Sequence, residues 1–345
     1  MNSVIFEGSP SKNFFQWVSG RSVLLIIIVL AIIPFLSPYE ALATQIIIWG
    51  LLALGYNILY GYTGLLSFGH AAYFGLGAYA TGIVLIRTKC SLLAGIGSGV
   101  LVSCLGAILI GFFCLRRRGI YFALLTMAFA QMLYFTASIW ESLTGGEPGL
   151  RNIPHPPLEI PGLFSFNIYT PIRFYFFVWA FVAISLLLLN RILESPFGRV
   201  LQGIRENEKR ARALGYNVNR IKWLSFILSG TFSGLAGALH TLYINFVGLE
   251  QLYWETSGKI LLMTLLGGPG TFFGPFIGAG TFLYLEDLIS GFTQYWMIVL
   301  GPIFILCVLF FPQGIWGTVR DFADKFKATS LKREQTNWKS LEPRT

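Results

Sequence analysis

A basic, amphipathic segment occupies residues 194–222. Its apolar residues recur at the spacing of one helix face: Phe197, Val200, Leu201 and Ile204. Basic residues surround that stripe: Arg199, Arg205, Lys209, Arg210, Arg212, Arg220 and Lys222, with Glu206 and Glu208 between them. Such a segment binds a partner rather than catalysing a reaction. Two interpretations are equally open: docking of another protein, or an interfacial helix on anionic lipid.

Local signals divide this segment into two short amphipathic helices. Ser195-Pro196 is typical of a helix start, with serine as the capping residue and proline at the first helical position. Ala211 and Leu214 continue the apolar face, and Gly215 predicts a helix stop.

The sequence shows no signature of catalysis. It has no GxxxxGK[ST] phosphate loop, no nucleophile elbow and no paired-carboxylate pattern. Its three histidines are too scattered for a metal motif, and its four cysteines have no paired spacing. We therefore expect no metal, no bound cofactor and no enzymatic activity.

Isolated polar residues inside apolar stretches are the second group with possible function. In hydrocarbon such groups face a protein interior or water, so they are candidates for lining a transport pathway. These candidates are Asn57, Thr63, Ser67, His70, Thr126 and Gln131. For His70 the favoured alternative is a hydrogen bond to a neighbouring helix or a position near the cytoplasmic interface. Lys259 also lies in an apolar run, where it either extends to the outer face or binds a carboxylate.

The elements that position these residues are membrane helices. Apolar residues make up 54% of the 345 residues and charged residues 12%, about half the charged share of soluble domains. Ten apolar runs predict an all-α integral membrane protein with about ten crossings. They cover residues 22–36, 41–60, 68–86, 91–115, 120–139, 172–193, 223–247, 252–267, 272–288 and 294–311. The first run is short, and a signal peptide is the alternative to a retained helix there.

The positive charges fix the predicted orientation. Alternating the ten crossings places 20 of the 25 Lys and Arg residues on one face and four on the other, with Lys259 inside a span. Lys and Arg accumulate in cytoplasmic loops, so both termini and segment 194–222 are predicted inside. The predicted domains are a cytoplasmic N-terminal segment 1–21, a transmembrane domain 22–318 with an outer loop 140–171, and a basic cytoplasmic tail 319–345. The net charge of +9 is spread over short loops, so nucleic acid is not an expected partner.

Two glycine-rich segments interrupt the apolar runs. One contains Gly61 and Gly64, and the other Gly267, Gly268 and Gly270. Paired broken segments point to a transport pathway and a duplicated architecture. Around 252–288 a re-entrant pair is the alternative to two crossings, because non-helical backbone is tolerated where protein or water covers it.

Several motifs together resemble the permeases of ABC importers for branched-chain amino acids. Residues 195–199, 203–208 and 213–215 (SPFGR, GIRENE and ALG) resemble that family's coupling loop. Four further motifs agree in order and spacing from about residue 50 to 318: GYTGLLSFGH at 61–70, GIYFALLT at 119–126, GGPGT at 267–271 and FPQG at 311–314.

The resemblance implies a division of labour in a bacterial inner membrane. The permease would pair with a second, similar permease and would be driven by two cytoplasmic ATPase subunits, which bind the ATP. A periplasmic or extracellular binding protein would deliver the solute. The ATPase-coupling residues carried over are Phe197, Gly198, Arg199, Ile204, Arg205, Glu206, Asn207, Glu208, Leu214 and Gly215.

Three alternatives remain open from the sequence. The nearest is import of urea or short amides by the same architecture. An ion-coupled carrier would want an acid deep in the membrane, whereas Glu286 and Asp287 lie towards the outer end of a predicted span. A membrane enzyme is disfavoured because its chemistry is absent.

Overall fold

In the computed structural model, the described residues are 11–37, 39–88, 90–154, 158–160, 164–166, 170–293, 295–311 and 313–319. They form helices joined by short loops, together with one two-stranded antiparallel hairpin. The long helices are α1 (Ser11–Leu36), α2 (Glu40–Asn57), α3 (His70–Thr88), α4 (Leu92–Cys114), α5 (Ile120–Ile139), α7 (Pro171–Glu194), α10 (Val218–Ile244), α11 (Trp254–Gly267), α12 (Gly274–Ser290) and α13 (Trp296–Phe310). The short elements are the π-helix η1 (Ile58–Tyr62), α6 (Glu141–Thr144), β1 (Leu158–Ile160), β2 (Phe164–Phe166), α8 (Pro196–Glu206), α9 (Glu208–Ala213) and the 3-10 helix η2 (Leu249–Gln251).

Each of the ten predicted apolar runs lies on a helix, so their helical nature is confirmed. Within the described residues, five helices are long and apolar enough to cross a membrane: Glu40–Tyr62, α4, α5, α7 and α10. A further apolar stretch, Val23–Leu36, is shorter. The total of ten crossings and the cytoplasmic placement of both termini remain predictions.

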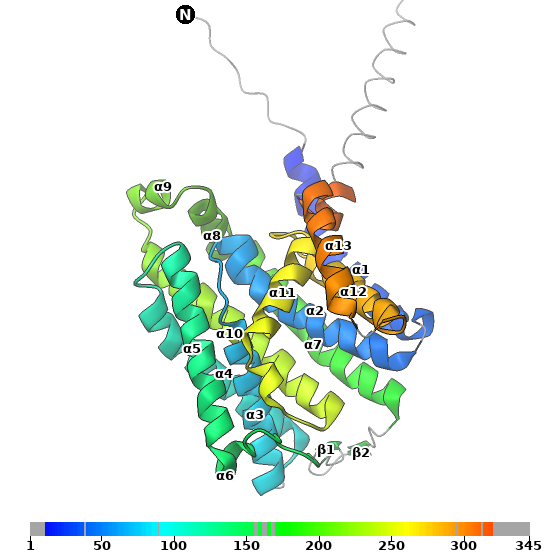
Figure 1. Cartoon of the computed structure of the whole chain (residues 1–345). Helices are drawn as coiled ribbons and strands as arrows, with labels where there is room; N and C mark the ends of the chain where they lie inside the picture. Colours follow the sequence, from blue (N-terminus) through cyan, green and yellow to red (C-terminus); the bar gives the residue numbers. More distant parts are fainter. Residues whose placement is uncertain are drawn as a thin grey trace, which may run out of the picture.

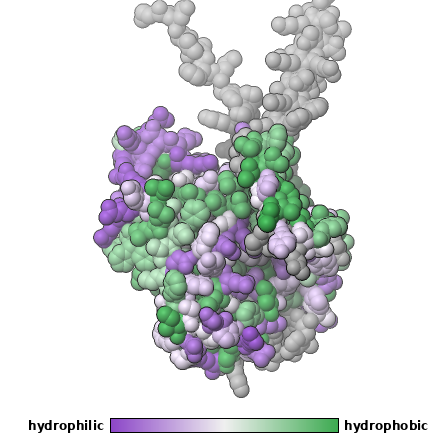
Figure 2. Space-filling model, in the orientation of Figure 1, coloured by the Kyte–Doolittle hydropathy of each residue, from purple (hydrophilic) through white to green (hydrophobic). Residues whose placement is uncertain are grey.

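The two ends of the helical bundle differ in what they carry (Figure 1). Helices α8 and α9 lie at one end, together with the first turns of α1 and the C-terminal end of α13. Helix α6 and the β1–β2 hairpin lie at the opposite end. Hydrophilic residues gather over α8 and α9, and hydrophobic residues cover much of the surface below them (Figure 2). This arrangement agrees with a membrane-embedded bundle that has an outer loop at one end and segment 194–222 at the other.

The predicted outer loop 140–171 contains a short hairpin, which the all-α fold class did not include. Leu158 pairs with Phe166 and Ile160 with Phe164 across antiparallel strands. The alternation of Leu158, Glu159 and Ile160 is the period-two pattern of a strand, which is too short to stand out beside the apolar runs.

Helices α3, α4 and α10 form the most closely packed part of the bundle, with glycines at their contacts. A Cβ atom at Gly99 of α4 would lie 2.6 Å from the carbonyl oxygen of Gly77 on α3. A Cβ atom at Gly234 of α10 would overlap the side chain of Ser103 on α4. The hydroxyl of Ser103 donates a 2.9 Å hydrogen bond to the carbonyl of Tyr73 on α3. Small residues thus let these backbones approach, as expected where lipid provides no hydrophobic drive.

Helix α1 packs against α7 through backbone carbonyls as well as apolar side chains. The Trp179 indole donates a 3.0 Å hydrogen bond to the carbonyl of Ile27, and the Tyr175 hydroxyl donates one to the carbonyl of Leu30. Val23 is also buried. The first apolar run is therefore integrated into the bundle.

Helices α11 and α12 form an antiparallel pair closed by the break at 268–273. Near the break, a Cβ atom at Gly278 would overlap the carbonyl of Met263. At the far end, the Lys259 ammonium lies 3.4 Å from a carboxylate oxygen of Glu286. The partner of Lys259 is thus a carboxylate of the same chain, and binding of a solute carboxylate by Lys259 stays a prediction.

Candidate functional site

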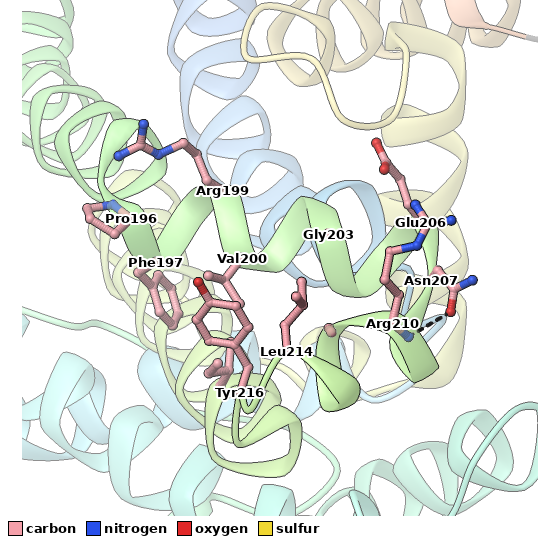
Figure 3. A pocket seen from close by; sticks show the side chains of 12 residues that line it. Pro196, Phe197, Arg199, Val200, Gly203, Glu206, Asn207, Arg210, Leu214 and Tyr216 are labelled. Carbon is pink, nitrogen blue, oxygen red and sulfur yellow. Dashed lines mark hydrogen bonds between the residues drawn. The ribbon is translucent and has the colours of Figure 1, made fainter. Parts of the chain in front are cut away.

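The surface of α8 and α9 contains a groove of about 590 Å³ (Figure 3). Apolar side chains line its interior and charged side chains its rim. The lining residues are Pro196, Phe197, Arg199, Val200, Gly203, Glu206, Asn207, Arg210, Ala211, Leu214, Tyr216 and Ile221. Five of the ten predicted coupling residues therefore lie together at one surface: Phe197, Arg199, Glu206, Asn207 and Leu214.

The predicted apolar stripe of α8 is split between the protein interior and this groove. Leu201 and Ile204 are buried, and Ile204 packs with Ala211 of α9 and Val218 of α10. Phe197 and Val200 are half-buried and line the groove. Leu214 leaves 71% of its surface exposed, although it is apolar and lies at the hydrophilic end of the molecule. An exposed apolar surface of this kind, rimmed by charge, is typical of a protein-docking site.

The predicted helix boundaries of this segment are confirmed, with one correction. Helix α8 begins at Pro196, and α9 ends just before Leu214 and Gly215, where Gly215 has a φ of +88°. The side chain of Ser195 does not cap α8, because its hydroxyl donates a 2.6 Å hydrogen bond back to the carbonyl of Ile192. Gly198 is buried where α7 turns into α8, and a Cβ atom there would overlap the backbone of Leu193. A glycine is thus needed for this sharp turn.

Glu208 is the centre of an ion-pair cluster that ties this segment to its neighbours. Its carboxylate lies 2.8 Å from both Arg212 and Lys222 and 3.3 Å from Arg118 in the loop after α4. Partial burial alone would raise the pKa of Glu208, but hydrogen bonds from Lys222 and Arg212 and the charges of Lys222 and Arg118 outweigh it. The pKa of this carboxyl is therefore below its usual value. The cluster joins the loop after α4, α9 and the start of α10.

Arg205, in the last turn of α8, reaches the two glycine-rich segments. Its guanidinium donates a hydrogen bond to the carbonyl of Gly61. A Cβ atom at Gly64 would lie 3.2 Å from its Cγ atom, and one at Gly270 would lie 2.5 Å from its Nη1 atom. Gly64 and Gly270 have φ values of +76° and +81°. The segments predicted as broken are therefore non-helical at the points where Arg205 lies over them.

The side chain of Asn57 joins the same two segments to each other. Its amide nitrogen donates a 2.8 Å hydrogen bond to the carbonyl of Thr271, and its oxygen accepts a 2.9 Å bond from the backbone of Gly270. Because Asn57 is fully buried, these bonds satisfy polar groups that would otherwise be costly. Two segments more than 200 residues apart are thereby fixed side by side.

The remaining motifs converge on this region as well. A Cβ atom at Gly314 would overlap the backbone of Gly268, so the motif after α13 packs on the second broken segment. The backbone nitrogen of Phe68 donates a 3.2 Å hydrogen bond to the hydroxyl of Thr126. A Cβ atom at Gly69 would lie 2.6 Å from the carbonyl of Thr126. The motif at 119–126 thus contacts the motif at 61–70, and the motif at 311–314 contacts the motif at 267–271.

Most of the candidate pathway residues are buried within the chain. Thr63 donates a 2.9 Å bond to the carbonyl of Ile58, and Ser67 accepts a 3.2 Å bond from the backbone of Gly69. Like Asn57 and His70, Thr63, Ser67 and Thr126 are buried. Gln131 is half-buried on α5. Their role as pathway lining stays a prediction; the printed bonds of Thr63 to Ile58 and of Ser67 to Gly69 are local, whereas Thr126 binds the backbone of Phe68, 58 residues away.

His70 is held between three helices. The hydroxyl of Ser229 on α10 donates to the carbonyl of Gly55 on α2 at 2.7 Å, so its proton is already used. The 2.7 Å contact between His70 Nε2 and that hydroxyl therefore has the imidazole N–H as donor. The Tyr56 ring packs edge-on against the His70 ring. This is the favoured interpretation of His70, a hydrogen bond to a neighbouring helix.

Sequence reasoning missed the serines that complete these contacts. Ser225 and Ser229 on α10 meet Thr63 and His70, and Ser257 on α11 accepts a 2.9 Å bond from the backbone of Ala71. The spacing of Ser225, Ser229 and Ser233 at every fourth residue was the available signal, because it places them on one helix face.

Comparisons with known proteins agree with these motifs. A family model described as the permease component of the branched-chain amino acid transport system matches residues 39–308. The high-affinity branched-chain amino acid transport system permease protein LivM of Salmonella typhimurium is 30% identical over 344 residues, which cover 92% of this chain and 80% of that protein. The corresponding LivM protein of Escherichia coli is 29% identical with the same coverage. The permease protein LivH of Salmonella typhimurium is 27% identical over 292 residues, covering 78% of this chain and 91% of that protein. No solved structure has significant similarity to this chain.

Proposed function

This chain belongs to the family of branched-chain amino acid transport system permease components, and we propose that it is the membrane-spanning permease subunit of a bacterial ABC importer for branched-chain amino acids. The observation that carries the proposal is the similarity to LivM proteins over 92% of the chain. The proposal places the protein in the inner membrane as a multi-pass subunit with segment 194–222 in the cytoplasm.

The proposed partners are a second permease, two ATPase subunits and a solute-binding protein. Similarity to both LivM and LivH of one organism supports pairing between two different but related permeases. The groove between α8 and α9 supports ATPase docking, because it offers exposed apolar side chains with Arg199, Glu206 and Arg210 at its rim. In this arrangement ATP is bound by the ATPase subunits.

The proposed mechanism uses α8 and α9 as levers. Hydrolysis in the ATPase subunits moves the surface that holds the groove, and α8 transmits this movement to the glycine-rich segments beneath it. The spans then open alternately towards the two faces of the membrane. The binding protein selects the solute.

The decisive experiment combines purification with uptake. The chain should co-purify with ATPase subunits, and ATP-dependent leucine uptake should be competed by isoleucine and valine but not by urea. Competition by urea instead would favour the short-amide alternative. Uptake by the isolated chain, driven by an ion gradient without ATPase subunits, would refute the ABC importer role.

A labelling experiment tests the orientation. Cys90 is exposed in the loop between α3 and α4, which is predicted to face outward. In whole cells a membrane-impermeant maleimide should label Cys90, whereas Leu214→Cys in a Cys90→Ser background should react only after the membrane is opened. Labelling of Leu214→Cys from outside would contradict the cytoplasmic placement of the groove.

A further inference from the structure

Arg205 has a position that docking alone does not require. It is absent from the lining of the groove, and it extends from the last turn of α8 towards the membrane-embedded helices. Much of the residue is exposed, but its hydrogen bond to the carbonyl of Gly61 is partly buried. The side chain therefore spans from the docking surface to the interior.

The carbonyl that Arg205 binds lies at a helix end. Gly61 is in the last turn of the continuous helix α2–η1, where carbonyl groups lose their intrahelical donors and carry the negative end of the helix dipole. The backbone nitrogens of Gly64 and Leu65 donate to the carbonyls of Tyr60 and Leu59. A guanidinium suits the carbonyl of Gly61, because it brings both a hydrogen-bond donor and a positive charge.

The second glycine-rich segment lies under the same guanidinium. Gly270 leaves room for the Arg205 Nη1 atom, and Asn57 binds both Gly270 and Thr271. Since Asn57 immediately precedes η1, one asparagine and one arginine connect α8, η1 and the break between α11 and α12. A displacement of α8 must either carry both broken segments with it or break these contacts.

We propose that Arg205 is a positioning residue that makes α8 and the two glycine-rich segments, at Gly61–Gly64 and Gly267–Gly270, move as one unit, so that both segments shift only when α8 is driven. This inference rests on the proposed function. It assigns Arg205 to transmission of movement, whereas the groove residues bind the ATPase subunit. Loss of Arg205 therefore uncouples hydrolysis from transport without detaching the ATPase.

The test uses the complete complex in proteoliposomes, with ATP hydrolysis and leucine uptake measured in parallel. Arg205→Met should retain the ATPase subunits and hydrolyse ATP, while leucine uptake per ATP falls about tenfold, the effect of losing one charged hydrogen bond in the moving state. Arg205→Lys should recover part of the uptake, because its point charge can reach one segment but cannot bridge both. Arg220→Met is the matched control, since it removes the same charge from the first turn of α10, outside the groove lining.

A second readout follows the movement directly. Leu66, just after the first glycine-rich segment, is exposed, so Leu66→Cys can report accessibility to a maleimide. In the parent complex its labelling rate should change when the ATPase is trapped with ATP and vanadate, and in Arg205→Met it should not change.

The outcomes separate this inference from the proposed function. The positioning role would be overturned if Arg205→Met kept its uptake per ATP within about twofold of the parent complex. It would also be overturned if Arg220→Met lost as much uptake per ATP as Arg205→Met. Dissociation of the ATPase subunits in Arg205→Met would also overturn it, because Arg205 would then be a docking residue. If the parent chain itself binds no ATPase subunits, it is the proposed function that fails.

Discussion

The guanidinium of Arg205 donates a hydrogen bond to the carbonyl of Gly61, a residue 144 positions earlier in the chain. This contact joins segment 194–222 to the last turn of the continuous helix α2–η1. Asn57 extends the connection to Gly270 in a second break. The segment that carries the proposed docking groove is therefore in direct contact with the irregular backbone of both glycine-rich segments, as the proposed transmission of movement requires.

The groove predicts which substitutions weaken assembly. Leu214 is 71% exposed, so Leu214→Asp should leave the fold of the chain intact. If the groove holds an ATPase subunit, the new charge has to be desolvated on docking, and retention of that subunit should fall about tenfold or more. Quantitative co-purification measures this, with Leu214→Met as the matched apolar control. Equal retention of the ATPase by both variants would contradict docking at the groove.

The ion-pair cluster of Glu208 predicts a pH-dependent contribution to stability. The pKa of Glu208 is lowered in the folded state, so its stabilisation is fully present above the ordinary glutamate pKa of about 4.5 and is lost as the pH falls through the folded value. Glu208→Gln should therefore lower the free energy of unfolding at pH 7 by about 1–2 kcal/mol, between the values for exposed and buried pairs.

Thermal unfolding of the purified protein in detergent measures this difference. The gap between the parent protein and Glu208→Gln should narrow as the pH is lowered below about 4.5. Glu206→Gln is the control, because Glu206 is exposed and lies outside the cluster. A gap that stays constant down to pH 3 would show that the charge of Glu208 is not what stabilises the segment.

Sequence patterns predicted the membrane helices and the local boundaries of segment 194–222. Apolar runs become helices because a backbone embedded in the bilayer must form its hydrogen bonds within the same segment. Such runs can be recognised in a sequence from their composition and length alone. Pro196 and Gly215 act within one helical turn, so they could also be recognised locally.

The contacts that connect these elements could not be predicted in the same way. Arg205 binds a backbone carbonyl, and every residue has one, so no side-chain pattern identifies Gly61 as its acceptor. Asn57 was recognised as a polar residue in an apolar run, but its partners Gly270 and Thr271 lie on a distant segment. The hydroxyl of Ser195 could either cap α8 or bind the carbonyl of Ile192. The tight turn after α7 favours the bond to Ile192, and this turn could not be predicted from the local sequence.

The ion pair between α11 and α12 predicts a rescue by charge exchange. Lys259 and Glu286 lie 3.4 Å apart with side chains 32% and 23% exposed. Removing one charge leaves the other poorly solvated near the membrane, so Lys259→Met should lower stability by about 1–2 kcal/mol.

The double variant Lys259→Glu/Glu286→Lys should recover most of the stability that each charge reversal loses on its own. Thermal unfolding of the two single reversals and of the double variant measures the coupling energy of the pair. Glu255→Gln is a control, because Glu255 is exposed near the start of α11. Additive effects of the two reversals would mean that the pair does not stabilise this helix hairpin.

Two glycines on α4 predict opposite responses to the same substitution. A Cβ atom at Gly99 would lie 2.3 to 3.2 Å from atoms of Thr81, Gly77 and Ala238, so Gly99→Ala forces α3 and α10 away from α4. Overpacking of this kind costs about 1–3 kcal/mol. A Cβ atom at Gly97, two residues earlier on the same helix, would meet nothing within 4 Å. Gly97→Ala should therefore be neutral or slightly stabilising, because alanine favours the helix.

Thermal unfolding in one detergent compares the stability of the two variants. Measuring uptake by the same two variants shows whether the close α3–α4–α10 packing is also needed for transport. Equal stability of both variants would show that these helices can separate without cost, and the glycine contacts would then not explain how the bundle is held together.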